Sequence, residues 1–279
     1  MFIVDVIPLA YLPVSEPQIL SYFFNSSLER GSIVEVPLAR KKVIAVVWRS
    51  ENISQRKAIL KKADFALKPI GKVITKKPLS KKISFFLANF ISHYYFSPLS
   101  LSLKQVLPKK LKSLARDLEK SDYSEPRGNT FLNLNKKDSR KIETLEKNFE
   151  EIFKKINQNL KKKKQILFLV PTVFHLSFYS KKLSAHNFNS NKLIIFQSNL
   201  KTKEFISLWK GIDNGKILFV IGTRSSLFLP WKNLGLIVVV EPNDSAYKSW
   251  DQKPYYQSLA IAKKLSFFYN AEVAYYQNY

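Results

Sequence analysis

Cysteine is absent from this chain of 279 residues, which excludes disulfide bridges, thiolate metal ligands and cysteine nucleophiles. Histidine is scarce as well: only three are present, at His93, His175 and His186, and each stands alone in the sequence. A zinc site needs three or four converging ligands, so isolated histidines argue against one. We therefore expect no bound metal and no other cofactor.

Signals for export and for membrane insertion are also missing. The first residues, Phe2 to Val6, carry an early acid and no basic segment, unlike a signal peptide. The longest apolar stretch, at about residues 85–103, is interrupted by polar side chains and by Pro98, unlike a membrane span. The sequence therefore predicts a cytoplasmic protein without a membrane partner.

Positive charge dominates the chain. Lys and Arg number 46 against 21 Asp and Glu, giving a formal net charge of +25, and the excess is spread over both halves. Hydrophobic residues make up 46%, which is typical of a folded chain and excludes disorder along its whole length. A folded chain this basic is typical of a salt-sensitive nucleic-acid binder. The alternative is a solvated, lysine-rich surface.

The first part of the chain predicts a small, mostly antiparallel β unit. Apolar, β-branched runs of strand length occur at residues 2–8, 32–37 and 43–49. Residues 79–96 place apolar side chains at helical spacing and predict a helix that closes the sheet. The polar residues 109–128 predict a linker, so we expect a first domain at 1–108.

Strand and helix patterns then alternate through a second domain, residues 129–279. Strands are expected at 130–135, 166–170, 193–196, 217–221, 236–240 and 272–276, and helices at 142–160, 174–184, 203–210 and 256–268. Alternation of this kind predicts βαβ units and a parallel sheet covered on both faces. The expected fold class is α/β, with a β-rich domain preceding a parallel-sheet lobe.

Specific motifs run through both domains. They are GSIVEVPL at 31–38, LKPI at 67–70, ISHYY at 91–95, VIGTRSSLF at 220–228 with LGLIVV at 234–239, and DSAYK at 244–248. In these motifs the chain resembles the PriA family of primosomal replication-restart helicases (primosomal protein N′). The resemblance covers nearly the whole chain. It implies an N-terminal domain for the 3′ end of DNA, followed by a RecA-like first motor lobe.

The nucleotide site implied by the resemblance is degenerate. The family's phosphate-binding loop is expected at residues 136–141, where no glycine stands, although Arg140 and Lys141 remain able to touch one phosphate. In the family's Asp-Glu-Glu-His box the leading acid is Val240 here, and only Glu241 remains in the place of the water-orienting acid. Without a phosphate cradle and a magnesium carboxylate, phosphoryl transfer loses most of its catalysis. We therefore expect no ATPase.

Other parts of the family pattern are also missing from the sequence. It stops near the motif that follows the acidic box, so we expect no second motor lobe. The stretch 109–128 stands where the family carries a winged-helix domain, and the cysteine-rich zinc segment is absent.

In the first domain the resemblance implies a pocket for a 3′-terminal nucleotide. Its positions correspond here to Ser21, Tyr22, Ala39 and Lys68. Tyr22 matches the family as an aromatic wall and Lys68 as a cation for phosphate, whereas Ser21 replaces an aspartate and Ala39 a glycine. The alternatives are that Tyr22 is a core residue and Lys68 a solvated one.

Two further groups are candidate DNA contacts. Arg40, Lys41 and Lys42 lie at a predicted hairpin tip. Thr223 and Arg224 follow a predicted strand, where a hydroxyl and a guanidinium suit backbone phosphates of single-stranded DNA. The alternative is that Arg224 pairs with Glu241 or Asp244. Nearby aromatic residues are interpreted mainly as packing, with base stacking as the alternative: Trp231, Tyr247, Trp250, Tyr255 and Tyr256.

The sequence as a whole predicts a PriA-like DNA-binding protein of replication restart that has no motor of its own. Its expected partners are fork or single-stranded DNA, together with replication or repair proteins. One alternative is an ATP-dependent 3′–5′ DNA helicase, as the family implies. The other is a non-enzymatic interaction module whose basic surface serves a different purpose.

Overall fold

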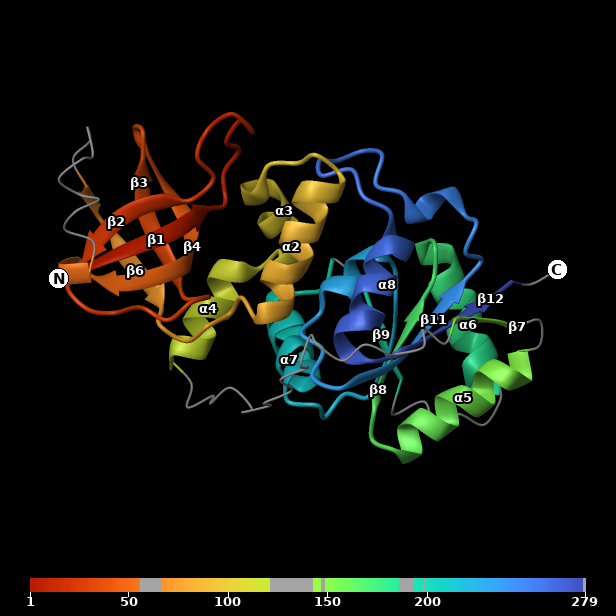
Figure 1. Cartoon of the computed structure of the whole chain (residues 1–279). Helices are drawn as coiled ribbons and strands as arrows, with labels where there is room; N and C mark the ends of the chain where they lie inside the picture. The colour runs from red at the N-terminus through yellow and green to blue at the C-terminus, as the bar shows by residue number, and fades with distance from the viewer. Residues whose placement is uncertain (56–66, 121–142, 147–148, 186–192, 198, 278–279) are drawn as a thin grey trace. The chain divides into compact units, whose positions relative to one another are not determined.

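The structure is a computed structural model that describes residues 1–55, 67–120, 143–146, 149–185, 193–197 and 199–277 (Figure 1). It divides into two compact units, Met1–Glu125 and Pro126–Tyr279. Each unit has its own sheet and is described by itself.

A curled six-stranded sheet forms the first unit, in the order β5-β2-β1-β4-β3-β6. Its strands are β1 (Phe2–Pro8), β2 (Leu20–Phe24), β3 (Ile33–Leu38), β4 (Lys41–Asn52), β5 (Lys68–Pro69) and β6 (Lys72–Thr75). All neighbouring pairs are antiparallel except β2 and β5. The curl brings β5 into contact with β3 and encloses a core of alternate side chains, among them Val4, Val34 and Val47.

Among the described residues of this unit, three helices and a short 3-10 turn follow or join the strands. They are η1 (Ile53–Gln55), α2 (Lys82–Tyr94), α3 (Leu99–Val106) and α4 (Leu111–Lys120). Helix α2 confirms the predicted helix, whereas α4 occupies half of the predicted linker 109–128. The four residues Leu111, Leu114, Ala115 and Leu118 of α4 are buried, and the helix contacts β6. At these positions the chain is therefore packed structure rather than a spacer.

The second unit is a six-stranded parallel sheet in the order β7-β12-β11-β8-β10-β9. Its strands are β7 (Glu143–Glu146), β8 (Gln165–Leu169), β9 (Leu193–Phe196), β10 (Phe219–Gly222), β11 (Leu234–Val240) and β12 (Glu272–Tyr276). The connections are α5 (Phe149–Lys161), α6 (Val173–Ala185), α7 (Thr202–Asp213), η3 (Arg224–Phe228), η4 (Ser245–Tyr247) and α8 (Ser258–Tyr269). The predicted α/β class, with a β-rich first domain and a RecA-like lobe, is confirmed.

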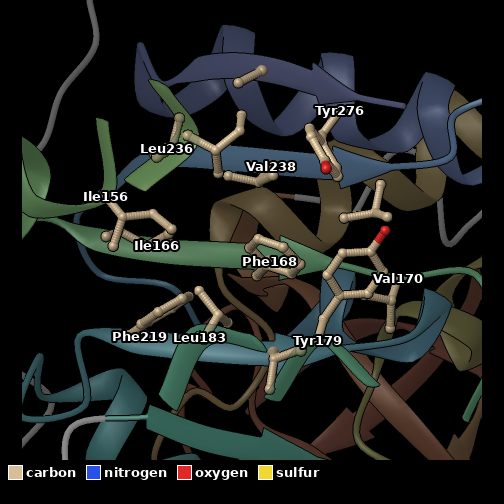
Figure 2. Packing of buried hydrophobic residues seen from close by; sticks show 14 of the residues in the cluster. Ile156, Ile166, Phe168, Val170, Tyr179, Leu183, Phe219, Leu236, Val238 and Tyr276 are labelled. Atoms are coloured by element: carbon tan, nitrogen blue, oxygen red, sulfur yellow. The ribbon is translucent and has the colours of Figure 1, made fainter. Parts of the chain in front are cut away.

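Helices cover this sheet on both faces. Side chains of α5 and α6 pack with Ile166, Phe168, Leu236 and Val238 in one buried cluster (Figure 2). Helix α8 contacts β11, whose Ile237 alternates with that cluster and lies on the other face. Every residue of β8, β10 and β11 is buried, as expected for parallel strands between two helical layers.

One predicted element is wrong at its start. The helix expected at 142–160 begins at Phe149, and residues 143–146 form strand β7 instead. The predicted strand 130–135 and loop 136–141, with Arg140 and Lys141, lie outside the described residues.

A buried glutamine ties the start of β8 to two neighbouring loops. Gln165 is fully buried, and its Nε2 donates to the carbonyl oxygens of Ile212 and Ile217, each at 2.9 Å. Its Oε1 accepts from the N–H groups of Lys232 at 2.7 Å and Asn233 at 2.9 Å. One buried side chain thus bonds two backbone donors and two backbone acceptors around the start of β8.

We predict that Gln165→Leu lowers the free energy of unfolding of the second unit by more than about 3 kcal/mol, because it strands several buried polar groups at once. Urea denaturation monitored by circular dichroism measures the change. Gln158→Leu, at an exposed position of α5, is the matched control and should stay within about 0.5 kcal/mol of the parent chain. Equal stabilities of the two variants would contradict the role given to Gln165.

Candidate nucleic-acid interface

Tyr22 belongs to the core of the first unit. Its side chain is only 4% exposed and packs with the interior cluster of the curled sheet. Its hydroxyl donates a 2.8 Å hydrogen bond to the carbonyl oxygen of Pro37, and burial raises the pKa of Tyr22. These contacts favour the core interpretation of Tyr22 over that of an aromatic wall for a nucleotide.

Ser21 points the opposite way, as neighbouring residues of a strand must. Its hydroxyl donates to Asp5 Oδ1 at 2.7 Å, and Asp5, itself 4% exposed, forms a salt bridge with Arg49 at 3.0 Å. Arg49 also lies 3.3 Å from Glu51. Ser21 is thus part of a network across β2, β1 and β4, and the structure does not bring it together with Tyr22. An acid inside the apolar strand β1 was the sequence signal for this pair.

Lys68 and Ala39 lie near Tyr22 and are exposed. Lys68 on β5 is the register partner of Tyr22 on β2. Ala39 follows two residues after Pro37, the acceptor of the Tyr22 hydroxyl, and begins the two-residue connection between β3 and β4. Its φ of +50° lies in the left-handed region that glycine adopts at least cost. The glycine implied by the resemblance therefore matches a real backbone requirement.

Three cations stand at the tip of the β3–β4 hairpin, which confirms the predicted turn. Arg40, Lys41 and Lys42 are all exposed, and the last two pair in register with Leu38 and Pro37. Positive side chains on a projecting two-residue turn are free to approach phosphates without displacing packed structure.

Thr223 and Arg224 follow the buried strand β10, as predicted. Thr223 precedes η3, and its carbonyl oxygen accepts from the N–H of Ser226 at 2.8 Å. The guanidinium of Arg224 donates to the carbonyl oxygen of Lys248 at 2.5 Å and lies 3.8 Å from Asp251. The ion-pair partner is thus Asp251 and not Glu241 or Asp244, and Arg224 anchors the loop that follows η4.

That loop exposes two of the five aromatic residues singled out in the sequence. Trp231, Tyr247 and Tyr256 are buried, which confirms packing for these three. Trp250 is 68% exposed and Tyr255 is 50% exposed, and the ammonium of Lys248 lies 5.2 Å from the centre of the Trp250 ring. Bases of single-stranded DNA stack on exposed aromatic rings, and its phosphates bind nearby cations.

An aromatic cluster fills the carboxyl edge of the sheet where α5 begins. Phe149, the first residue of α5, is 6% exposed and packs against the rings of Tyr179 and Tyr276. The ammonium of Lys182 lies 4.4 Å from the Phe149 ring and 3.2 Å from the Tyr276 hydroxyl. Figure 2 shows Tyr179 and Tyr276 at the same end of the cluster as Val170. Sequence reasoning missed this cluster because its members are scattered along the chain.

Glu241 lies beside this aromatic cluster, directly after β11. Its backbone has a φ of +47° and its N–H donates to the Tyr276 carbonyl at 2.7 Å. Burial, with a smaller contribution from the Glu241 carboxylate, raises the pKa of Tyr179 well above its ordinary value. Val240 is fully buried in the core, and within the described ranges no three acidic or histidine side chains converge to hold a metal ion. No helix of those ranges is long and apolar enough to cross a membrane.

Fold and surface together define a two-unit α/β protein in which a small curled β domain precedes a RecA-like lobe. Residues 10–108 match the family model of the PriA 3′ DNA-binding domain (3′BD). The chain is 32% identical over 255 residues to the replication restart protein PriA of Rickettsia conorii, covering 86% of this chain and 38% of that protein. It is 30% identical over 255 residues to the replication restart protein PriA of Helicobacter pylori, covering 88% and 38%.

The comparisons confirm the resemblance to the PriA replication-restart family that the motifs indicate. The chain spans 38% of the length of these curated relatives. Among solved structures, the crystal structure of the DUF1998 helicase MrfA bound to DNA matches with a TM-score of 0.34 and 13% identity, covering 48% of this chain and 18% of that one. A likeness at this level carries no argument.

We predict that Tyr22→Phe destabilises the first unit by about 1 kcal/mol, since it leaves the Pro37 carbonyl without its donor, while DNA affinity changes less than twofold. Thermal unfolding and fluorescence anisotropy on one preparation measure the two effects. A large loss of DNA affinity without a loss of stability would contradict the core role and indicate that Tyr22 contacts DNA. Tyr11→Phe, at an exposed tyrosine of the same unit, is the control.

Proposed function

We propose that this chain is a DNA-binding protein of replication restart that holds branched or single-stranded DNA and has no ATPase of its own. The observation that carries the proposal is the match of residues 10–108, which hold strands β2 to β6 of the curled sheet and helices α2 and α3, to a 3′ DNA-binding domain. Replication or repair proteins are the expected further partners.

Charge and exposure in the first unit support DNA binding. The cations Arg40, Lys41, Lys42 and Lys68 are exposed on the same sheet, and the chain as a whole carries a net charge of +25. Lysine and arginine bound to phosphates release counterions, which gives affinity that falls steeply with salt. Recognition of a 3′ end then rests on the exposed neighbours of Tyr22 rather than on Tyr22 and Ser21.

The loop between η4 and α8 supports a second contact, with single-stranded DNA. Arg224 donates to the Lys248 carbonyl at the start of this loop, and the ring of Trp250, two residues further on, is exposed. An aromatic side chain has few rotatable bonds, so it loses little conformational entropy when a base stacks on it. Thr223 and Arg224 directly follow the carboxyl end of β10. Open α/β sheets bind their ligands at the carboxyl ends of their strands.

The start of α5 supports the absence of a motor. The loop that the resemblance implies before this helix, at residues 136–141, contains no glycine, whereas a phosphate-binding loop needs glycines to wrap a triphosphate. The first turn of α5 carries Glu150 and Glu151, and two carboxylates at a helix N-terminus repel an anion that would bind there. Phe149 is packed in the same place.

The end of β11 supports it as well. A motor holds Mg²⁺ through a carboxylate at this position, and the side chain here is Val240, fully buried among apolar neighbours. Glu241 alone orients no metal, and its backbone N–H is bonded to β12. Phosphoryl transfer depends on positioning the phosphates and on neutralising their charge. The sequence has neither the glycines for the first nor the magnesium carboxylate for the second.

We predict that the purified chain hydrolyses ATP no faster than a buffer blank, with Mg²⁺ present and with or without single-stranded DNA. A coupled assay and a direct phosphate-release assay measure the rate. DNA-stimulated turnover that Glu241→Gln reduces would contradict the proposal and favour the helicase alternative. A background rate that Glu241→Gln leaves unchanged marks a contaminant.

We predict that Lys68→Ala weakens binding to a duplex with a 3′ single-stranded tail and lowers the slope of log K against log salt by about 1, the value for one lost phosphate contact. Fluorescence anisotropy on tailed and blunt DNA measures both effects, and blunt DNA should change less. Lys104→Ala, at an exposed position on α3, is the matched control. Equal losses on both DNAs would remove Lys68 from the 3′-end site.

A further inference from the structure

Helix α4 carries a row of cations on its exposed side. Lys109, just before the helix, and Lys112, Arg116 and Lys120 within it are all exposed. At 3.6 residues per turn, positions four apart share a face, so Lys112, Arg116 and Lys120 fall within about 80° around the axis, and Lys109 precedes them in the turn that leads into the helix. We call these four residues the α4 stripe.

The opposite side of α4 is fixed to the sheet. Leu114 and Ala115 are fully buried. Glu119 accepts hydrogen bonds from the Thr75 hydroxyl at 2.7 Å and the Lys76 N–H at 3.2 Å, and Lys77 donates to the Leu118 carbonyl at 2.9 Å. The carboxylate of Glu119 is thus directed to the end of β6. A helix held in this way presents its cations in one fixed row, with little backbone ordering left for a ligand to impose.

The chemistry of the row selects its partner. A basic amphipathic helix binds a membrane surface or a partner's groove through its apolar face, but the apolar face of α4 is already buried against the unit. What remains is a line of positive charge. From Lys112 to Lys120 the helix rises about 12 Å, a length over which one strand of B-form DNA presents three or four phosphates.

We propose that the α4 stripe binds the phosphate backbone of DNA, as a contact separate from the 3′-end site around Lys68. The stripe reads no bases; it adds affinity and fixes the orientation of the DNA on the first unit. The proposal rests on the proposed function, since it requires that the chain binds DNA. It extends that function to a segment which the sequence predicts to be a linker.

The test compares the intact chain with K109Q/K112Q/R116Q/K120Q in fluorescence anisotropy on 3′-tailed and fully single-stranded DNA between 50 and 200 mM salt. Four lost phosphate contacts make the slope of log K against log salt shallower by about 3.6 on duplex or 2.8 on single strands. Over this range the parent chain then loses about 10²-fold more affinity than the variant. Arg116→Gln alone, a single exposed change, is expected to lower the slope by about 0.9.

The matched control removes the same charge from exposed lysines of the other unit, as K154Q/K161Q/K203Q/K216Q. Equal slopes for the two quadruple variants would show that only net charge matters and would overturn the stripe. So would a variant that keeps the parent's DNA slope but loses binding to vesicles containing phosphatidylserine. If the intact chain binds no DNA at any salt concentration, the proposed function fails first. Circular dichroism confirms that each variant is folded.

Discussion

In the second unit, an ammonium group packs against aromatic rings at the carboxyl edge of the sheet and joins three elements there. Lys182 lies over Phe149 and donates to Tyr276, so the start of α5, the end of β12 and helix α6 close on one another. Open parallel sheets bind ligands at this edge because the strand ends and helix N-termini leave a crevice there. Here aromatic side chains pack at this edge beside α5. The exposed ring of Trp250 and the nearby cation of Lys248 lie instead in the loop that follows η4.

In the first unit the corresponding constraint is strand alternation. One strand position faces the interior and the next faces out, so the chain cannot place both Tyr22 and Ser21 in one pocket. Tyr22 faces the interior and donates to the Pro37 carbonyl. Ser21 faces the other way and donates to Asp5, which is paired with Arg49. Under the proposed function, the pocket for a DNA end uses exposed residues of neighbouring strands and turns, such as Lys68 and Ala39.

The sequence predicts the elements that carry strong patterns and misses those defined by tertiary contacts. Strands β1, β8 and β11 are mostly apolar, and each is found where it is expected. Strand β5 has two residues and exists only because β2 pairs with it, which no local pattern reveals. Helix α4 was missed because the stretch 109–128 as a whole is polar, although Leu111, Leu114 and Leu118 have helical spacing. For the candidate site, motifs located the exposed cations, while the burial of Tyr22 required the fold.

Under the proposed function, the substitutions in the second unit follow one physical logic. A nucleotide site keeps charged groups and flexible glycine backbone at the edge of a sheet, and such sites are maintained at a cost in stability. Where no magnesium ion has to be bound, a carboxylate at the end of β11 has no function to offset its cost in stability. The residue at this position is Val240, which is fully buried. Phe149 converts the start of α5 into core in the same way. Glu241 has a left-handed backbone, with a φ of +47°, at the turn by which the chain leaves β11. Under the proposed function, the lobe combines the fold of a motor with exposed side chains that serve to hold DNA.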